Sequence, residues 1–244
     1  MPKSSKRYRA LQAQVDAARR YSTDEAFELL KTLASSDNKA KFVESVDVAI
    51  RLGVDPRKSD QMVRGACELP HSTGRVVRVL VFAEGEAAQL AQEAGADYVG
   101  AEEFIEKIQK EGWLEFDKVV ATRSMMPKIG RVARILGPKG LMPNPKVGTV
   151  VEADKMQETI GSLKRGKISF RAEKLSGIVH AAIGNSGMEA NKLKDNFCAL
   201  VSTLIRMKPT TAKGTYLRSI SLSTSMGPGI KVDAQDAHRT AERS

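Results

Sequence analysis

The sequence predicts an α/β protein of two domains. One is a split α+β domain, an antiparallel sheet with helices, formed by both chain ends; the other is an inserted, small, doubly wound parallel α/β domain of Rossmann-like type. Three observations lead to this prediction. Apolar and polar residues alternate along 45–52, a nearly continuous apolar run at 75–83 begins a β-α-β-α-β alternation, and alternating strands return after residue 161. A length of 244 residues is ample for two cores.

The N-terminal part predicts two helices and a strand. Residues 1–20 are basic, with Leu11 and Val15 at helical spacing, and we expect a helix that forms or settles on a partner. Residues 22–25 (STDE) carry an N-cap signal, and the AFELLKTL that follows predicts an amphipathic helix. Every second residue of 45–52 is Val, Ile or Leu, so this strand should bury one face.

The middle part alternates strands and helices. We expect strands at 75–83, 96–100 and 116–122, with helices at 84–95 and 101–112 between them. Such an alternation favours a parallel sheet with helices on both faces.

The last third returns to antiparallel signals. A turn near 175–177 joins two strand patterns over 166–184 into an expected hairpin, and residues 191–208 predict an amphipathic helix. The residues 214–232 predict a second hairpin that turns at 226–229.

These elements define the expected domains. Residues 1–72 and 164–231 form the discontinuous α+β domain, 73–163 form the inserted α/β domain, and 232–244 should be a disordered tail. Two connections to the insert permit hinge motion but restrict twisting.

Charge is distributed unevenly over these segments. Residues 1–72 hold 13 Lys/Arg against 10 Asp/Glu, residues 73–163 hold 12 against 13, and residues 164–231 hold 12 against 3, within a net charge of +10. The basic flanks are expected to contact a polyanion, although a solvated basic surface is the plainer alternative. Aromatic residues make up only 5%, which argues against a base-stacking platform.

Several function classes find no support in the sequence. Cys67 and Cys198 lie far apart, and His71, His180 and His238 lack ligand partners at useful spacing, so we expect no disulfide, metal site or catalytic residue. We also expect no membrane segment or secretion, because no long apolar run occurs. Neither GxGxxG nor a P-loop motif occurs, so we expect no cofactor and no small-molecule substrate. A nucleotide-dependent enzyme built on the middle domain remains the alternative class.

The most distinctive segment is RILGPKGLMPNPKVGTV at 134–150. Six of the twelve residues in 137–148 are Gly or Pro, so the segment is neither helix nor central strand. Its apolar residues indicate a loop of defined shape, which displays Lys139 and Lys146 or merely serves packing.

This segment resembles the signature of the ribosomal protein L-one family, in its bacterial form. Further resemblance lies in KFVESVDVAIRLGVDPRKSDQMVRG (41–65), FDKVVATRSMMPKIGRV (116–132) and KPTTAKGTYLRSISLSTSMGPGIKV (208–232). The resemblance implies a cytoplasmic protein of the mobile stalk of the large ribosomal subunit, and not an enzyme. Its implied partners are large-subunit rRNA at the stalk helices, exit-site tRNA whose release it assists, and its own operon mRNA, which it represses. A free RNA-binding regulator is a further alternative.

The resemblance also implies site residues. The strand phenylalanine matched by Phe42 and the turn matched by Ser225, Met226 and Gly227 form the main rRNA surface in that family, and Lys139 and Lys146 are candidates to face tRNA. The full set of candidate rRNA-binding residues is Lys41, Phe42, Glu44, Ser45, Asp47, Lys167, Ser169, Arg171, Lys174, His180, Ser219, Ser223, Thr224, Ser225, Met226 and Gly227. From the residues alone, Phe42 could equally be a core residue, and 224–227 a plain hairpin turn.

Overall fold

The computed structural model describes residues 5–37 and 39–243 and divides them into two compact units. The first unit runs to Gly74 and resumes at Ile168, and the second unit comprises Arg75–Lys167. The sequence placed the second boundary four residues earlier, after 163. The boundary lies later because helix α7 (Met156–Arg165) continues past that point and buries Ile160 and Leu163 in the core of the second unit.

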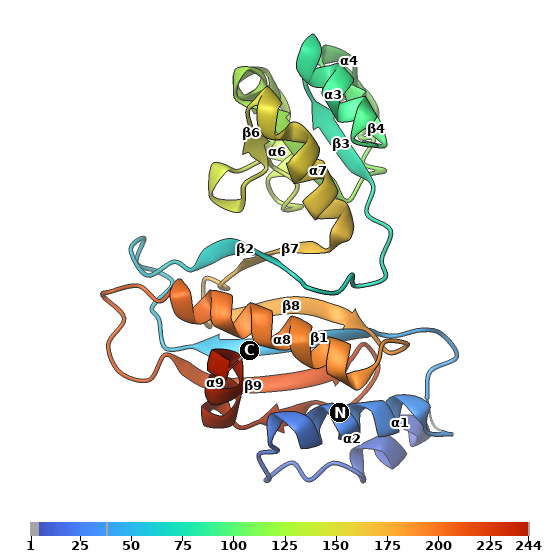
Figure 1. The fold of residues 1–244 in the computed structure, drawn as a ribbon, viewed down its shortest axis with the longest axis vertical. Coiled ribbons are helices and arrows are strands. Elements are labelled where there is room, and N and C mark those ends of the chain that lie inside the picture. The colour runs from blue at the N-terminus through green and yellow to red at the C-terminus, as the bar shows by residue number, and fades with distance from the viewer. Residues whose placement is uncertain (1–4, 38, 244) are drawn as a thin grey trace. The chain divides into compact units, whose positions relative to one another are not determined.

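The first unit is built on an antiparallel sheet in the strand order β10-β9-β1-β8 (Figure 1). Its strands are β1 (Ser45–Leu52), β8 (Ile178–Asn185), β9 (Leu217–Thr224) and β10 (Ile230–Val232). Strand β1 lies in the middle, with Val48 opposite Ala181 on one side and Leu222 on the other. The sheet therefore requires both ends of the chain.

One face of this sheet is covered by helices, and the other is polar. The covering helices are α2 (Thr23–Ser35), α8 (Ala190–Arg206) and α9 (Ala234–Arg243). The alternate residues Val46, Val48, Ile50 and Leu52 of β1 are all buried in one core with them. Because successive side chains of a strand point to opposite faces, this alternation gives the strand one buried face and one solvent-exposed face.

A second, two-stranded sheet corrects the expected hairpin over 166–184. It pairs β2 (Arg64–Glu68) with β7 (Lys167–Arg171), so β7 and β8 belong to different sheets. They meet only at their ends, where Ala172 forms a bridge to Val179. Phe170 of β7 is buried, and Gly65 of β2 leaves room for the side chain of Met207, which a Cβ atom at Gly65 would meet at 2.7 Å. Packing against a distant strand thus prevailed over the local turn.

Helix α1 (Lys6–Gln12) ends earlier than the basic helix predicted within 1–20, of which residues 1–4 lie outside the described residues, and it is anchored. Leu11 and Val15 are buried at 3% and 8% exposure in the core of the first unit. Further along, Tyr21 forms a parallel bridge with Val232 and thereby covers the edge of β10. The segment is thus held by its own fold and needs no partner to be seated.

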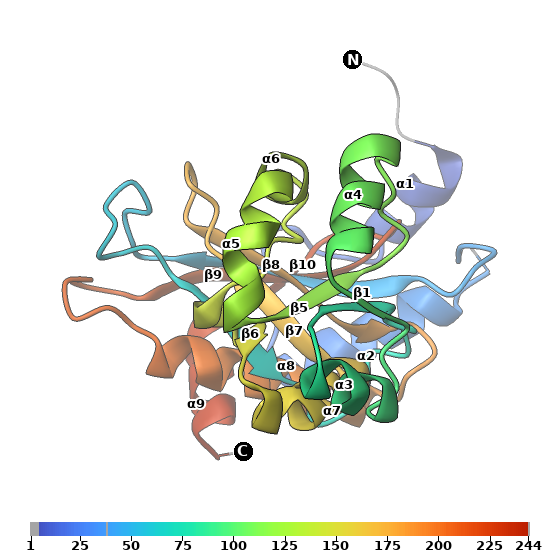
Figure 2. The same cartoon turned by 90° about the horizontal axis from the view of Figure 1, so that it is seen from above.

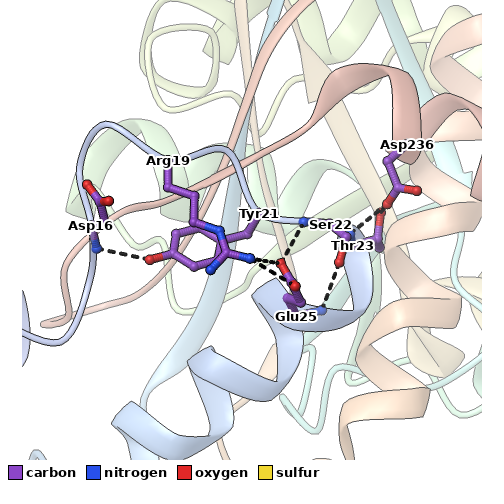
Figure 3. Close-up of polar contacts among 7 residues, drawn as sticks. All are labelled: Asp16, Arg19, Tyr21, Ser22, Thr23, Glu25 and Asp236. Atoms are coloured by element: carbon purple, nitrogen blue, oxygen red, sulfur yellow. Dashed lines mark hydrogen bonds and ion pairs between the residues drawn. The ribbon is translucent and has the colours of Figure 1, made fainter.

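The expected disordered tail is wrong, because residues 234–243 form helix α9. Asp236 accepts hydrogen bonds from the backbone nitrogen of Thr23 at 2.7 Å and from its hydroxyl at 2.8 Å (Figure 3). Ala237 and Ala241, one turn apart, are buried against the core. Two alanines in a polar segment give little hydrophobic signal in the sequence, yet they permit close packing of the helix.

The second unit is a doubly wound parallel sheet in the order β4-β3-β5-β6. Its strands are β3 (Val79–Phe82), β4 (Tyr98–Gly100), β5 (Lys118–Thr122) and β6 (Val150–Val151). One face packs on α3 (Glu86–Glu93) and α7, and the other on α4 (Glu102–Glu111), α5 (Met126–Ile129) and α6 (Ala133–Leu136), as Figure 2 shows. Four short 3₁₀ turns complete it: η1 (Arg123–Met125), η2 (Gly130–Val132), η3 (Pro145–Val147) and η4 (Ala153–Lys155). The predicted mixture of an antiparallel and a parallel sheet is confirmed.

Strand β3 is shorter than the predicted 75–83. All four of its residues are buried, as a strand covered on both faces requires, whereas Val76 is 86% exposed. Arg75 and Arg78 instead form ion pairs with Asp117. These contacts hold the approach to the strand outside the sheet.

Candidate nucleic-acid interface

The turn between β9 and β10, which we call the Met226 turn (residues 224–229), is held from both sides. Its Met226 nitrogen donates to a carboxylate oxygen of Glu44 at 2.8 Å, and its Met226 carbonyl accepts from the Arg7 guanidinium at 3.0 Å. The Gly227 nitrogen donates to the Thr224 carbonyl at 3.1 Å. A Cβ atom at Gly227 would overlap the Thr224 hydroxyl, so glycine is required there. The turn is rigid, while the Met226 side chain remains 52% exposed.

The segment that leads into β1 lies beside this turn. Three hydrogen bonds join Ser45 and Ser225. The Ser45 nitrogen donates to the Ser225 hydroxyl at 3.2 Å, and the Ser45 carbonyl accepts from the Ser225 nitrogen at 3.1 Å and from the Ser225 hydroxyl at 3.5 Å. Just before Ser45, Phe42 is 59% and Val43 is 69% exposed. Large exposed apolar side chains gathered at one end of a sheet are typical of a contact surface. Phe42 is therefore not a core residue.

The surface beside Phe42 contains a depression. Its volume is about 480 Å³, and Lys39, Lys41, Phe42 and Ser186 are among the residues that line it. Two of these are cationic, which suits an anionic occupant.

Two candidate residues, one in the Met226 turn and one just before β1, point inward. Glu44 and Thr224 are only 4% and 8% exposed. Glu44 is further fixed by Ser186, whose hydroxyl accepts from the Glu44 nitrogen at 3.1 Å and whose nitrogen donates to the Glu44 carbonyl at 2.7 Å. Glu44 and Thr224 therefore stabilise the conformation of the Met226 turn and are not exposed to a partner.

The uncovered face of the four-stranded sheet continues from the Met226 turn. Asp47 lies opposite Ser223, His180 lies opposite Ala49, and Ser219 lies opposite Arg51. Burial raises the pKa of the Asp47 carboxyl, and the nearby charge of His180 opposes that rise. The structure thus brings together the candidates from β1, β8, β9 and the Met226 turn on one surface.

The candidates around β7 do not lie on this sheet. Ser169 and Arg171 are exposed on β7 in the two-stranded sheet, and Lys174 is exposed in the loop after it. Lys167 is the last residue of the second unit. Ser169, Arg171 and Lys174 of the first unit form a separate group, which we call the β7 group.

The Gly/Pro-rich loop of the second unit has a defined shape. The Asn144 nitrogen donates to the Thr149 hydroxyl at 2.8 Å, and the Asn144 side chain accepts from the Lys146 nitrogen at 2.8 Å. Leu141 and Met142 pack against the core. Lys139 and Lys146 are both exposed, so a preformed loop displays two cations.

The edge where doubly wound sheets usually bind ligands is acidic in this chain. That edge lies beyond the carboxyl ends of β3 and β5, where the strand order reverses. Glu84 lies in the turn after β3, and Glu86 begins α3. Lys128 is bound between Glu84 at 2.6 Å and Glu102 at 3.3 Å. Such an edge repels phosphate, which disfavours the nucleotide-dependent enzyme.

Sequence reasoning missed Arg7 and Ser186. The signal for Arg7 was the basic N-terminus, but nothing in the sequence places it beside a turn 219 positions away. Ser186 carries no motif, because its role depends on the end of β8 meeting Glu44.

Two further searches concern the described residues alone. No three His, Cys, Asp or Glu side chains of 5–37 and 39–243 gather as a metal site requires. Within the same ranges, no helix has both the length and the apolar character needed to cross a membrane.

Residues 30–228 match the model of the Ribosomal protein L1p/L10e family. The chain belongs to this family. Three relatives are named large ribosomal subunit protein uL1. The chain is 52% identical to the relative from Syntrophobacter fumaroxidans over 96% of each chain, 51% identical to that from Corynebacterium glutamicum over the whole of both, and 52% identical to that from Myxococcus xanthus over 97% of this chain and 98% of the relative.

Family membership confirms the resemblance found in the sequence. The protein is a ribosomal protein with a structural role, and it is not an enzyme.

Proposed function

We propose that this protein is part of the large ribosomal subunit in the cytoplasm and binds large-subunit rRNA at the stalk helices. The observation that carries the proposal is the Met226 turn, which Glu44 and Ser45 fix while Met226 and the neighbouring Phe42 stay exposed. A surface made rigid before contact loses little conformational entropy on binding. The names of the relatives support membership of the large subunit.

Hydroxyl groups and apolar side chains have distinct tasks on this surface. Ser45, Ser223 and Ser225 lie within one small region and can bond to 2′-hydroxyl groups and backbone oxygens of a folded RNA. Phe42 and Met226 would exclude water from those hydrogen bonds and so strengthen them. The RNA would thus be read by its shape.

Basic side chains supply affinity without sequence selectivity. Lys41 adjoins Phe42, whereas Arg171 and Lys174 lie in the β7 group. Contacts from these cations to phosphates position the RNA and make binding dependent on salt.

The second unit is proposed to act on exit-site tRNA. Its preformed loop presents Lys139 and Lys146, which can hold a tRNA backbone briefly and assist its release. The rRNA surface is also proposed to repress the protein's own operon mRNA, provided that this mRNA reproduces the rRNA shape.

Chemical footprinting of large-subunit rRNA with the purified protein tests the proposal. We expect protection at the stalk helices that disappears when Met226→Asp replaces the wild type. Sedimentation in high salt adds an independent check, since a free RNA-binding regulator would leave the large subunit and a stalk protein would remain with it. Protection elsewhere, or none, would contradict the proposed site.

A further inference from the structure

Helix α1 lies against the Met226 turn, far from it in sequence. Arg7 donates a hydrogen bond to the Met226 carbonyl at 3.0 Å. One turn later, Leu11 is 3% exposed and packs in the core of the first unit, and Val15 after the helix does the same. The helix therefore occupies a fixed place beside the candidate interface.

The remainder of the N-terminal segment fastens α1 in this place. The Tyr21 nitrogen donates to the Lys231 carbonyl at 2.9 Å, and the Lys231 ammonium donates to the Ala17 carbonyl at 2.7 Å. The segment ends at the Thr23–Asp236 contact drawn in Figure 3. Each of these contacts joins the N-terminal segment to residues that follow the Met226 turn.

All charged side chains of α1 are positive. Lys6, Arg7 and Arg9 are cationic, and the first acidic residue in the sequence is Asp16. Lys6 and Arg9 are exposed and three residues apart, so they share a helix face and repel each other. An anionic partner would attract both side chains and offset their mutual repulsion. Because the chain carries this charge beside a surface suited to RNA, the partner's chemistry is that of a phosphate backbone.

We propose that α1 is a basic flank of the RNA-binding surface. Lys6 and Arg9 contact phosphates of the RNA that the Met226 turn reads, and Arg7 is a positioning residue that holds this turn. The inference rests on the proposed function, since it needs RNA at the Met226 turn. It adds a second contact element, built from the opposite end of the chain.

The double variant Lys6→Gln/Arg9→Gln tests the phosphate contacts in the full-length protein. The probe is a fragment of bacterial large-subunit rRNA that carries the stalk helices, and filter binding is measured from 50 to 200 mM KCl. We expect about a tenfold loss of affinity at the lowest salt and a salt slope smaller by roughly 1.5, because each phosphate contact contributes about 0.7–0.9.

A matched control is Arg206→Gln/Arg239→Gln. It removes the same charge from exposed positions on α8 and α9, which cover the opposite face of the sheet. We expect less than a twofold change and an unaltered slope. Equal behaviour of the two double variants would overturn the proposal.

Met226→Asp in the same titrations separates the two levels of the argument. If Met226→Asp binds like the wild type, the proposed function itself fails. If Met226→Asp loses binding but Lys6→Gln/Arg9→Gln matches its control, the inference about α1 alone fails.

Hydrogen–deuterium exchange tests the positioning role of Arg7. In Arg7→Ala without RNA, we expect faster exchange of the backbone amides of 224–229, whereas Lys6→Gln/Arg9→Gln should leave them unchanged. Unchanged exchange in Arg7→Ala would remove the positioning role.

Discussion

The two units use their sheets in opposite ways. The antiparallel sheet of the first unit has helices on one face and polar side chains on the other, whereas the parallel sheet of the second unit is covered on both faces. The first unit can therefore offer strand residues such as Asp47 and Ser223 to a partner, whereas the strands of the second unit are hidden and only its helices and loops are accessible. An exposed sheet face gives a broad, rigid surface, and a loop gives a small one.

Charge follows the same division. The first unit holds 24 Lys/Arg against 16 Asp/Glu, a net of +8, and the second holds 15 against 13, a net of +2. The difference teaches that the sheet with the uncovered face also carries the electrostatic attraction for a polyanion. This difference in charge supports the proposal that the first unit attaches stably to RNA and the second makes only transient contact.

The largest expected effect comes from the apolar side chains of the first unit. Met226→Asp should reduce rRNA affinity about a hundredfold, roughly 3 kcal/mol, because a charge there lets water into the shielded hydrogen bonds and repels phosphate. Phe42→Ala should act in the same direction, and each should exceed any single change such as Lys41→Ala. Filter binding measures the affinity, and circular dichroism confirms that the variants are folded.

Met226→Leu is the matched control, since it retains an apolar side chain and should bind within about 1.5 kcal/mol of the wild type. Normal binding by a folded Met226→Asp protein would contradict the proposal that the first unit binds rRNA through its exposed apolar side chains.

The next largest effect is on the stability of the first unit, through the hydrogen bonds that join its N-terminal and C-terminal segments. Asp236→Ala should lower the free energy of unfolding by about 1–2 kcal/mol, because the Thr23 nitrogen and hydroxyl lose their acceptor. The backbone hydrogen bond from Thr23 lowers the pKa of Asp236, and its side-chain hydrogen bond adds to this against the opposing effect of burial. Urea titration measures the loss.

The pH dependence of that loss has a definite sign. A carboxyl with a lowered pKa in the folded state stabilises the protein above its unfolded pKa, about 3.9, and loses this contribution as the pH falls through the lower folded value. The difference between wild type and Asp236→Ala should therefore shrink below pH 4. Glu242→Ala, an exposed change on the same helix, should cost less than about 0.5 kcal/mol. A difference that persists undiminished at low pH would show that lost packing, and not the carboxylate, is responsible.

A smaller effect on rRNA is expected from the second unit. Lys139→Ala with Lys146→Ala should leave rRNA affinity within about 1 kcal/mol, because only exposed charges are removed. The dwell time of exit-site tRNA on reconstituted ribosomes should change instead. If rRNA affinity falls steeply, the division of tasks between the units is wrong; if the dwell time is unaltered, the loop serves only the packing of its own unit.

The smallest effect is a gain in stability. Among the described residues, Tyr216 has a buried hydroxyl with no hydrogen-bond partner, and burial raises its pKa to about 12. Tyr216→Phe removes this unpaired group and should stabilise the first unit by up to about 1 kcal/mol. Differential scanning calorimetry would show a small rise in Tm, and a lower Tm would mean that the hydroxyl has a partner such as water.

Much of this fold follows from local pattern. The alternation in β1 and the apolar run at β3 identify their strands, since burial on one or two faces leaves a direct trace in residue order. The pairing of β7 with β2 and the helix at Ala234–Arg243 left no such trace. The pairing joins two segments that lie far apart in the sequence, and the helix packs through small residues such as Ala237, which matter only once a distant surface is beside them.

The candidate site divides in the same manner. Met226 and Gly227 lie in a turn that the sequence pattern predicts, so these two residues could be identified from the sequence. Arg7 and Ser186 could not be predicted, because their side chains bond to backbone groups of distant residues, and a backbone group carries no residue-specific signal.

The central position of β1 sets the order in which the protein can fold during synthesis. Val46 must wait for Thr224, 178 positions later, whereas the second unit is one continuous segment that is finished first. At about 5–20 residues per second, the wait lasts roughly 9–36 s. Because β8 is made before β9, β1 lacks its β9 neighbour for all of this time and its β8 neighbour for most of it. The Met226 turn follows β9, so a chain that stops before residue 224 cannot display the completed surface. Under the proposed function, such an incomplete chain would not compete for RNA.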